Sequence, residues 1–270
     1  MEKRRADLHI HTNCSDGTFT PLEVVELASS KGISCISICD HDTVSGVEEA
    51  MLAGRRLGVE IIPGVEISAE ENGKELHILG YFVDYKDENF TRSLDQVRED
   101  RKERLFKIVD ALNQYGIDIQ AKDLLVFAGD VSISRLHIAK YLLEKGFVDS
   151  LQQAFNKYIG DNAPCYVANF RYSVKEAIEL IKSAKGIPVV AHPGLNNVKD
   201  FLPDILEAGI EGIEVYHTRH NSALVSYYTK YAKANNLFMT GGSDCHGLNK
   251  EELLIGTVTV PYAFVEEMRN

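Results

Sequence analysis

Short apolar runs alternate with amphipathic stretches along the first part of the chain. The apolar runs predict buried strands over 6–12, 33–38, 61–68 and 76–83. The amphipathic stretches predict helices over 20–31 and 44–57. The first helix opens on Thr20-Pro21-Leu22-Glu23, which has the order of a cap residue, a first-turn proline and a first-turn acid. This alternation favours parallel strands joined by crossover helices, and therefore an α/β fold.

The rhythm changes between residues 89 and 164. Apolar side chains recur there at helical spacing with no convincing strand among them, starting with Leu94, Val97, Leu105, Ile108, Val109 and Leu112. Two more helices are predicted over 134–145 and 149–158. We therefore expect a barrel-type domain made of 1–88 and 165–270, interrupted by a helical insertion at 89–164.

The strand–helix alternation resumes after the insertion. Helices are predicted over 174–184, 201–207 and 222–235. Strands are predicted over 187–191, 212–216 and 237–240, with a last apolar run at 254–260. The second half of the chain therefore completes the α/β domain begun by the first.

Composition narrows the classes of function. The chain has 270 residues with a formal charge of −11 and no long block of Lys or Arg, which argues against a long nucleic acid as partner. No apolar run reaches the roughly 18–20 residues of a membrane span. Five cysteines, an odd number without a CxxC pair, argue against a disulfide framework. We therefore expect a cytoplasmic protein that does not bind a membrane.

The histidines are placed in an informative way. His9 and His11 lie two residues apart on a predicted strand, so they share one face, and Leu8 and Ile10 are expected to face the helices. An isolated HxH motif is about as often a pair of hydrogen-bonded core histidines as it is a functional site. Here Asp16 follows in the loop after the strand, which favours a metal site.

The same arrangement recurs along the chain. Strand ends or their neighbourhood carry further imidazoles and carboxylates, namely His41, Glu66, His77, His192, Asp244 and His246. In a parallel α/β barrel the carboxyl ends of the strands open on one face, so these side chains are expected to converge. Imidazole and carboxylate together suit Zn, Mn or Fe. The pattern therefore predicts a polynuclear metal site, with Asp40 and Asp42 orienting ligands or capping a helix rather than binding metal.

These residues resemble the PHP (polymerase and histidinol phosphatase) family, in particular its small stand-alone phosphoesterases, over nearly the whole chain. The motifs that carry the resemblance are HxHTxxSDG at 9–17, DHD at 40–42, PGxE at 63–66, HILGY at 77–81, AHP at 191–193 and GGSDCHG at 241–247. The resemblance implies a distorted (β/α)7 barrel, with the helical insertion capping the active site.

The resemblance also implies three divalent metal ions, with their identity left open among Mn, Fe and Zn. One ion would be held by His9, His11, Glu66 and Asp244. Glu66 would bridge to a second ion held with His77 and His192, and the third ion would be held by Asp16, His41 and His246. Glu66, Asp244 and His192 are the catalytic residues that this comparison suggests.

Such a cluster has a simple charge balance. Three ionised carboxylates and three divalent ions leave a surplus of about three positive charges, which suits a phosphate even in an acidic protein. Metal binding lowers the pKa of water to about 7, so a metal-activated hydroxide is the expected nucleophile. The chain has no GxSxG elbow, and no side-chain nucleophile is needed.

Two patches outside the metal motifs are candidates for substrate binding. Ser134, Arg135 and His137 begin a predicted helix, whose N-terminus attracts anions. For a generic protein, a surface arginine and a histidine on a polar helix face would be the preferred interpretation. The resembling phosphoesterases have an equivalent Arg and His in their insertion. Arg219 and His220, after another strand, form the second patch, where a solvated loop is an equal alternative; His220 matches the family better than His217 does.

The main functional hypothesis is hydrolysis of a phosphate monoester of a small nucleotide, such as the 3′-phosphate of a nucleoside 3′,5′-bisphosphate. The resemblance implies this substrate class. A 5′→3′ exonuclease acting on short RNA is the first alternative, and a histidinol phosphatase is another. A non-catalytic metal-binding scaffold would belong to a different class, against which the intact set of nine ligands argues.

Overall fold

A computed structural model describes residues 4–72, 74–128, 133, 135–167, 172–195, 198–249 and 253–270. Its contacts divide the chain into two compact units: the barrel unit, residues 1–93 with 171–270, and the helical unit, residues 94–170. The expected insertion, 89–164, has boundaries close to those of the helical unit. Ser134 lies outside the described residues.

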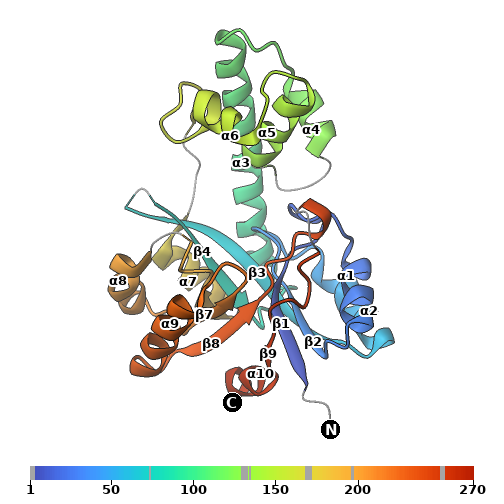
Figure 1. The fold of residues 1–270 in the computed structure, drawn as a ribbon, viewed down its shortest axis with the longest axis vertical. Coiled ribbons are helices and arrows are strands. Elements are labelled where there is room, and N and C mark those ends of the chain that lie inside the picture. Colours follow the sequence, from blue (N-terminus) through green and yellow to red (C-terminus); the bar gives the residue numbers. More distant parts are fainter. Residues whose placement is uncertain are drawn as a thin grey trace. The chain divides into compact units, whose positions relative to one another are not determined.

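The barrel unit is built on one mixed sheet with the strand order β8-β7-β6-β4-β3-β2-β1-β9, and β5 pairs with β3 (Figure 1). The strands are β1 Arg5–Ile10, β2 Cys35–Ile38, β3 Glu60–Glu71, β4 Lys74–Tyr81, β5 Tyr172–Ser173, β6 Ile187–Val190, β7 Gly212–His217, β8 Phe238–Gly242 and β9 Val260–Pro261. The segment after β8 returns to β1, where Asp244 N donates to His9 O at 2.9 Å and His11 N donates to Cys245 O at 2.9 Å. These bonds nearly close the sheet into a barrel, which confirms the expected α/β class.

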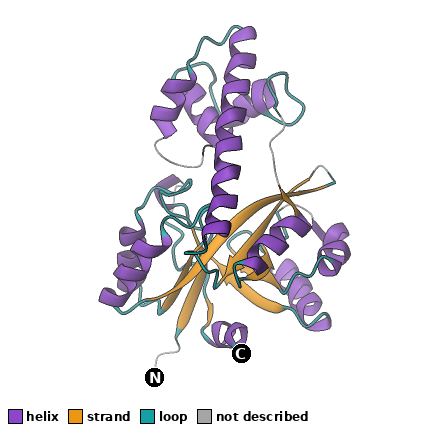
Figure 2. Cartoon of the chain, turned by 180° about the vertical axis from the view of Figure 1, so that it is seen from behind, coloured by secondary structure: helices purple, strands orange, loops and turns teal. Residues whose placement is uncertain are grey.

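Helices cover the outside of this sheet (Figure 2). Those of the barrel unit are α1 Pro21–Ser30, α2 Val47–Leu57, α7 Val174–Ser183, α8 Leu202–Glu207, α9 Ser222–Ala234 and α10 Ala263–Arg269. Thr20 caps α1 in a reciprocal capping box with Glu23, and Pro21 occupies the first turn, as the sequence predicted. Ser173 and Glu176 form the same box on α7. These caps satisfy backbone N–H groups that would otherwise lack partners.

The helical unit has its own apolar core. Helix α3, Glu88–Gln114, begins in the barrel unit, and α4 Ala121–Ala128, α5 Arg135–Glu144 and α6 Leu151–Ala154 follow, with a short π-helix at Phe155–Ile159. Leu105, Leu112, Leu124, Leu142 and Ile159 belong to the core cluster of this unit. No described helix has the length and apolar character needed to cross a membrane.

One strand runs against the expected direction. The sequence predicted parallel strands, but β4 is antiparallel to both β3 and β6. Its register places His77 opposite Ser68, two residues beyond Glu66 on β3. Because β4 is reversed, a residue in its first half lies at the end of the barrel where β3 carries Glu66. The reversal therefore explains how His77 reaches the other predicted ligands.

A second correction concerns β1. The register between β1 and β2 shifts between Asp7 and Ile10, which marks a bulge or irregularity. Ile10 packs with residues of α1 and α2, as expected. Leu8 instead belongs to a cluster with Cys35, Ile62, Leu79 and Val189 from other strands, together with residues of α10. The prediction that Leu8 faces the helices was wrong because strict alternation does not survive such a shift.

The last apolar run, at 254–260, is a bend that reaches the sheet only at β9. Gly256 has a φ of 74°, and its N–H donates to the buried carboxylate of Asp7 at 2.8 Å. Residues 254–260 therefore curve around Asp7, and the short helix α10 that follows was not foreseen.

The packing of Leu8 gives a stability prediction. Leu8→Ala removes a fully buried side chain and should lower the free energy of unfolding by about 2–5 kcal/mol. Leu52→Ala on α2, where the side chain is 57% exposed, should change it by no more than about 0.5 kcal/mol. Urea unfolding followed by circular dichroism measures both. Equal losses for the two variants would contradict the assignment of Leu8 to the core.

Candidate metal centre

His9 on β1 and His11, just after the end of that strand, point at the same place. His9 Nε2 lies 3.1 Å from His11 Nε2. The Oε2 atom of Glu66 lies 3.4 Å from the first and 3.2 Å from the second. Asp244 Oδ1 lies 3.6 Å and 3.3 Å from the same two nitrogens. Two imidazole nitrogens and two carboxylate oxygens therefore face one point, on side chains that are mostly buried.

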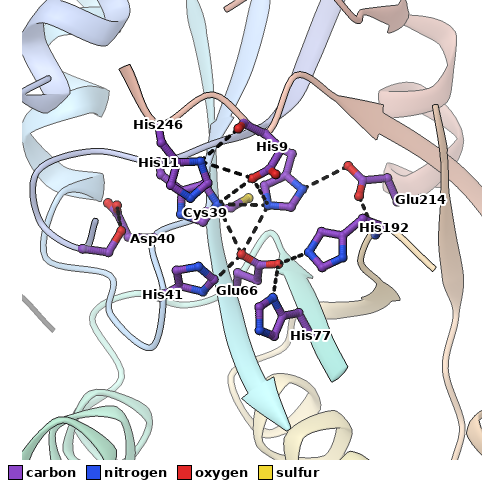
Figure 3. Close-up of polar contacts among 12 residues, drawn as sticks. His9, His11, Cys39, Asp40, His41, Glu66, His77, His192, Glu214 and His246 are labelled. Atoms are coloured by element: carbon purple, nitrogen blue, oxygen red, sulfur yellow. Dashed lines mark hydrogen bonds and ion pairs between the residues drawn. The ribbon is translucent and has the colours of Figure 1, made fainter. Parts of the chain in front are cut away.

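Glu66 is the centre of the arrangement (Figure 3). Besides its contacts with His9 and His11, the Oε2 atom of Glu66 lies 3.2 Å from His41 Nδ1. Its other oxygen, Oε1, lies 3.0 Å from His77 Nδ1 and 2.9 Å from His192 Nε2. The two oxygens thus face two separate groups of imidazoles, which is the arrangement needed for a carboxylate that bridges two cations.

Asp16 joins a third group of side chains. Its Oδ1 atom lies 3.3 Å from His246 Nε2 and 3.6 Å from His11 Nδ1. Its Oδ2 atom lies 3.9 Å from His41 Nε2. His41 therefore has one ring nitrogen toward Glu66 and the other toward Asp16. The structure brings all nine predicted ligands into one continuous cluster.

The donor set fits divalent cations. Three groups of side chains each offer ligand atoms within 4.8 Å of one another: His11 with Asp16, His41 and His246; His9 with His11 and Asp244; and His41 with Glu66 and His77. Within the part of the chain that the structure describes, His11 Nδ1 and His192 Nδ1 are buried without a hydrogen-bond partner. Facing imidazole nitrogens and partnerless buried nitrogens are what cations would satisfy.

The charges of the cluster hold its carboxylates ionised. Burial alone would raise the pKa of Glu66, but the surrounding imidazoles outweigh it and keep the pKa well below its usual range. The same balance keeps the pKa values of Asp16 and Asp244 low. Burial disfavours protonation of His11 and His77, yet their carboxylate partners outweigh it and raise both pKa values to about 10. At His41 burial dominates and lowers the pKa to about 4.

The backbone is strained where ligands leave the strand ends. His192 has a φ of 25° and Asp244 a φ of 50°, a region that residues with a side chain seldom occupy. Gly242, just before this turn, approaches β1 so closely that a Cβ would lie 2.4 Å from His9 N. The chain therefore needs glycine there to bring Asp244 beside His9.

Further buried acids hold the segments that carry the ligands. Asp40 accepts from Thr12 N and from Thr12 Oγ1, both at 2.7 Å, and fixes the turn before Asp16. Asp42 accepts from Ser68 N at 2.9 Å, two residues after Glu66. Their positions agree with an orienting function for both acids.

Glu214 and His217 on β7 also reach the cluster, and the sequence interpretation predicted neither of them as part of the metal site. Glu214 is fully buried beside His9, and His217 Nε2 lies 3.3 Å from Asp244 Oδ2. A carboxylate inside the apolar run 212–216 was the available signal.

The predicted substrate-binding residues lie in both units. In the barrel unit, Arg219 lines a cleft of about 280 Å³ together with Glu75, Leu195 and several predicted ligands. His220 uses both ring nitrogens on the backbone, since Nδ1 donates to Val215 O at 2.9 Å and Nε2 accepts from Gly194 N at 3.1 Å. A substrate would have to replace one of these bonds to use His220.

In the helical unit, Arg135 and His137 lie in the first turn of α5. Arg135 Nη1 donates to Asp161 Oδ1 at 2.6 Å and to Ile159 O at 3.3 Å. Together with Arg101 and Arg104 it lines a small cleft of about 10 Å³. This unit thus gathers three guanidinium groups around one concave surface.

Comparison with known proteins places this geometry in a family. A family model described as "PHP domain" matches residues 7–181. A 5′-3′ exoribonuclease of Haemophilus influenzae is 33% identical over 90% of this chain and 90% of its own length. A 3′,5′-nucleoside bisphosphate phosphatase of Chromobacterium violaceum is 31% identical over 89% of this chain and 86% of its own.

A solved structure has the same fold over nearly the whole chain. It is a candidate metal-dependent phosphoesterase from Bifidobacterium adolescentis, 30% identical, with a TM-score of 0.86 over 97% of this chain and 94% of that one. The match covers both the barrel and the insertion, and the barrel unit holds clusters of His, Asp and Glu suited to metal. The chain therefore belongs to the PHP domain family, and it is a metal-dependent phosphoesterase.

Proposed function

We propose that this protein removes a phosphate from a small nucleotide, with a nucleoside 3′,5′-bisphosphate as the substrate class, at a centre of three divalent cations. The observation that carries the proposal is the position of Glu66, whose two oxygens face separate groups of imidazoles. One cation would be held by His9, His11, Glu66 and Asp244. A second would be held by Glu66 with His77 and His192, and the third by Asp16, His41 and His246.

Divalent cations held by these ligands would supply hydroxide from water near neutral pH and neutralise the phosphoryl oxygens. The residues of the chain prepare that chemistry. Glu66, Asp244 and His192 stay the proposed catalytic ligands, because they lie on the wall of the cleft and face its interior. Six neutral imidazoles and three carboxylates leave the loaded site with a positive surplus, which draws a phosphate into an otherwise acidic protein.

Cleft size and lining support a small substrate. A volume of about 280 Å³ lies near the lower end of the range of small-molecule sites. Beyond the predicted ligands, the lining adds Glu75, Leu195 and the exposed side chain of Arg219. Arg219 is therefore proposed to bind a phosphate oxygen of the substrate, since a guanidinium group can donate two parallel hydrogen bonds to it.

The helical unit supplies a second group of positive charges, which are arginine side chains. Arg101, Arg104 and Arg135 line one cleft, and the N-terminus of α5 adds backbone N–H groups beside Arg135. We assign Arg135 and His137 to substrate binding, with Arg135 as the main phosphate contact. Ser134 stays a prediction from the sequence. His220 also stays one, although its two backbone bonds favour a positioning role.

A 5′→3′ exonuclease acting on short RNA is the second candidate. It is favoured by the H. influenzae relative, whose name states that activity and which aligns over 90% of both chains. The bisphosphate phosphatase relative aligns almost as far. Release of inorganic phosphate from a nucleoside 3′,5′-bisphosphate, compared with release of mononucleotides from a 5′-phosphorylated trinucleotide, separates the two activities. Histidinol phosphate in the same assay tests the third.

Removal of metal should abolish the activity. Protein treated with a chelator and then desalted should release no phosphate from a nucleoside 3′,5′-bisphosphate, and added Mn²⁺ should restore release, because the proposed nucleophile is a hydroxide supplied by the bound metal. Phosphate release measured colorimetrically, with metal content measured by mass spectrometry, checks both steps. Full activity in protein shown to be free of metal would exclude the proposed mechanism.

Metal affinity should depend on pH. In the metal-free protein the pKa values of His11 and His77 are about 10, so both rings hold a proton near neutral pH that a cation must displace. Affinity for Mn²⁺ should therefore fall on acidification, by about tenfold per pH unit for each displaced proton. Calorimetric titrations in buffers of different ionisation enthalpy measure affinity and proton release together. Affinity unchanged between about pH 8.5 and 6.5 would contradict the charge state inferred for these rings.

Arg135 should matter for a substrate with two phosphates. Arg135→Gln should raise KM for a nucleoside 3′,5′-bisphosphate by about 10- to 100-fold, which is the effect of losing a hydrogen bond to a charged group. Its KM for p-nitrophenyl phosphate, which has a single phosphate, should change little. Arg92→Gln, at an exposed position of α3, is the matched control. An equal effect on both substrates would refute the assigned role.

A further inference from the structure

Strand β7 carries none of the predicted metal ligands, yet it places two buried polar side chains directly behind them. Glu214 and His217 are both buried, and both contact residues of the metal cluster. They are three positions apart, so in a regular strand they would face opposite sides of the sheet. The register between β7 and β8 shifts between Glu214 and Tyr216, which marks a bulge. The bulge turns both side chains toward the cluster.

Glu214 fixes how His9 presents its ring. Its Oε1 atom lies 3.0 Å from His9 Nδ1, and neither side chain is exposed to solvent (Figure 3). An ionised carboxylate only accepts, so Nδ1 must be the nitrogen that carries the proton. His9 Nε2 then faces His11, Glu66 and Asp244 with its lone pair available to a cation.

The same carboxylate also holds His192. Its Oε2 atom accepts from the backbone N–H of His192 at 2.7 Å. That residue has a φ of 25°, a strained conformation that needs such support. One buried carboxylate therefore links a proposed ligand of the first cation, His9, to a proposed ligand of the second, His192.

His217 acts on Asp244 in a similar way. The N–H of Arg219 donates to His217 Nδ1 at 3.2 Å, so Nδ1 is an acceptor and Nε2 carries the proton. Nε2 can then donate to Asp244 Oδ2, which lies 3.3 Å away. This bond leaves Oδ1 of Asp244 turned toward His9 and His11.

We propose that β7 is the strand that orients the metal centre, with Glu214 and His217 as positioning residues that set the ring of His9, the backbone of His192 and the carboxylate of Asp244. The proposal rests on the metal-dependent function proposed above. In this proposal the two side chains determine metal affinity through the arrangement of their hydrogen bonds. A pair with a purely structural role would affect metal affinity through side-chain volume alone.

Glu214→Gln tests this claim at almost constant volume. An amide has one acceptor oxygen, whereas Glu214 accepts from two N–H groups, so either His192 N–H loses its acceptor or the NH₂ group faces His9 Nδ1. The second arrangement drives the proton of His9 onto Nε2 and blocks the ligand atom. We expect Mn²⁺ affinity to fall by about 10- to 100-fold, measured by calorimetry on metal-free protein.

Nitrogen-15 NMR provides a readout independent of activity. In wild-type protein loaded with diamagnetic Zn²⁺, His9 should show a protonated Nδ1 and a metal-bound Nε2, and this signature should be lost or shifted in Glu214→Gln. Ser37→Ala is the matched control, because it removes a buried hydroxyl that bonds to Ile62 O at 3.1 Å and to Cys39 Sγ at 3.3 Å, neither of which belongs to a predicted ligand. It should lower thermal stability while leaving Mn²⁺ affinity within about twofold.

Two variants of His217 test the orienting role independently. They decide whether it holds if Glu214→Gln does not fold. His217→Gln can place an N–H donor near the position of Nε2, whereas His217→Leu cannot donate to Asp244. We expect His217→Leu to weaken Mn²⁺ binding by about tenfold or more, and His217→Gln to recover most of that loss.

The outcomes separate this proposal from the proposed function. Wild-type Mn²⁺ affinity in Glu214→Gln and His217→Leu would overturn the orienting role while leaving the phosphoesterase mechanism standing. Equal losses in His217→Gln and His217→Leu would also overturn it, because volume alone would then explain the effect. Wild-type protein that binds no Mn²⁺ and releases no phosphate would instead refute the proposed function itself.

Discussion

The structure depends on one buried carboxylate that is surrounded by imidazoles. Glu66 is 1% exposed, and each of its oxygens faces a different group of histidines. Such a group in a protein interior is stable only with positive charge beside it, which protons on the rings or bound cations can supply. Without metal, this positive charge comes from protons on the rings of His11 and His77, whose pKa values are raised. Binding of cations replaces protons with charge that can act on a phosphate.

Irregular backbone brings the ligands to that carboxylate. A bulge in β1 separates Leu8 from the strict alternation, and a bulge in β7 turns Glu214 and His217 to the same side. Positive φ values at His192 and Asp244 store strain where these ligands leave their strands. The regular sheet and its apolar core stabilise these backbone irregularities, and the irregularities orient the side chains toward the metal cluster.

Positive charge in this acidic protein is concentrated at a few places. The chain as a whole carries a formal charge of −11, yet three arginines, Arg101, Arg104 and Arg135, share one cleft of the helical unit. In the barrel unit, Arg219 stands beside a cleft whose lining includes the predicted ligands. An acidic surface repels long nucleic acids, whereas local cations still bind a small phosphorylated molecule.

The sequence by itself determined the α/β class and indicated which imidazoles and acids gather, because ligand types recur beside the ends of apolar runs whose period is local. The tertiary structure decided the rest. The antiparallel direction of β4, the bulges, and the contact of Glu214 with His9, 205 positions away, depend on pairings between distant strands. Hydrophobic period records which face of a strand is buried, but it does not record strand direction or register. For that reason the contacts of Glu214 and His217 with the metal cluster became visible only in the tertiary structure, although the acid in the apolar run 212–216 was a signal in the sequence.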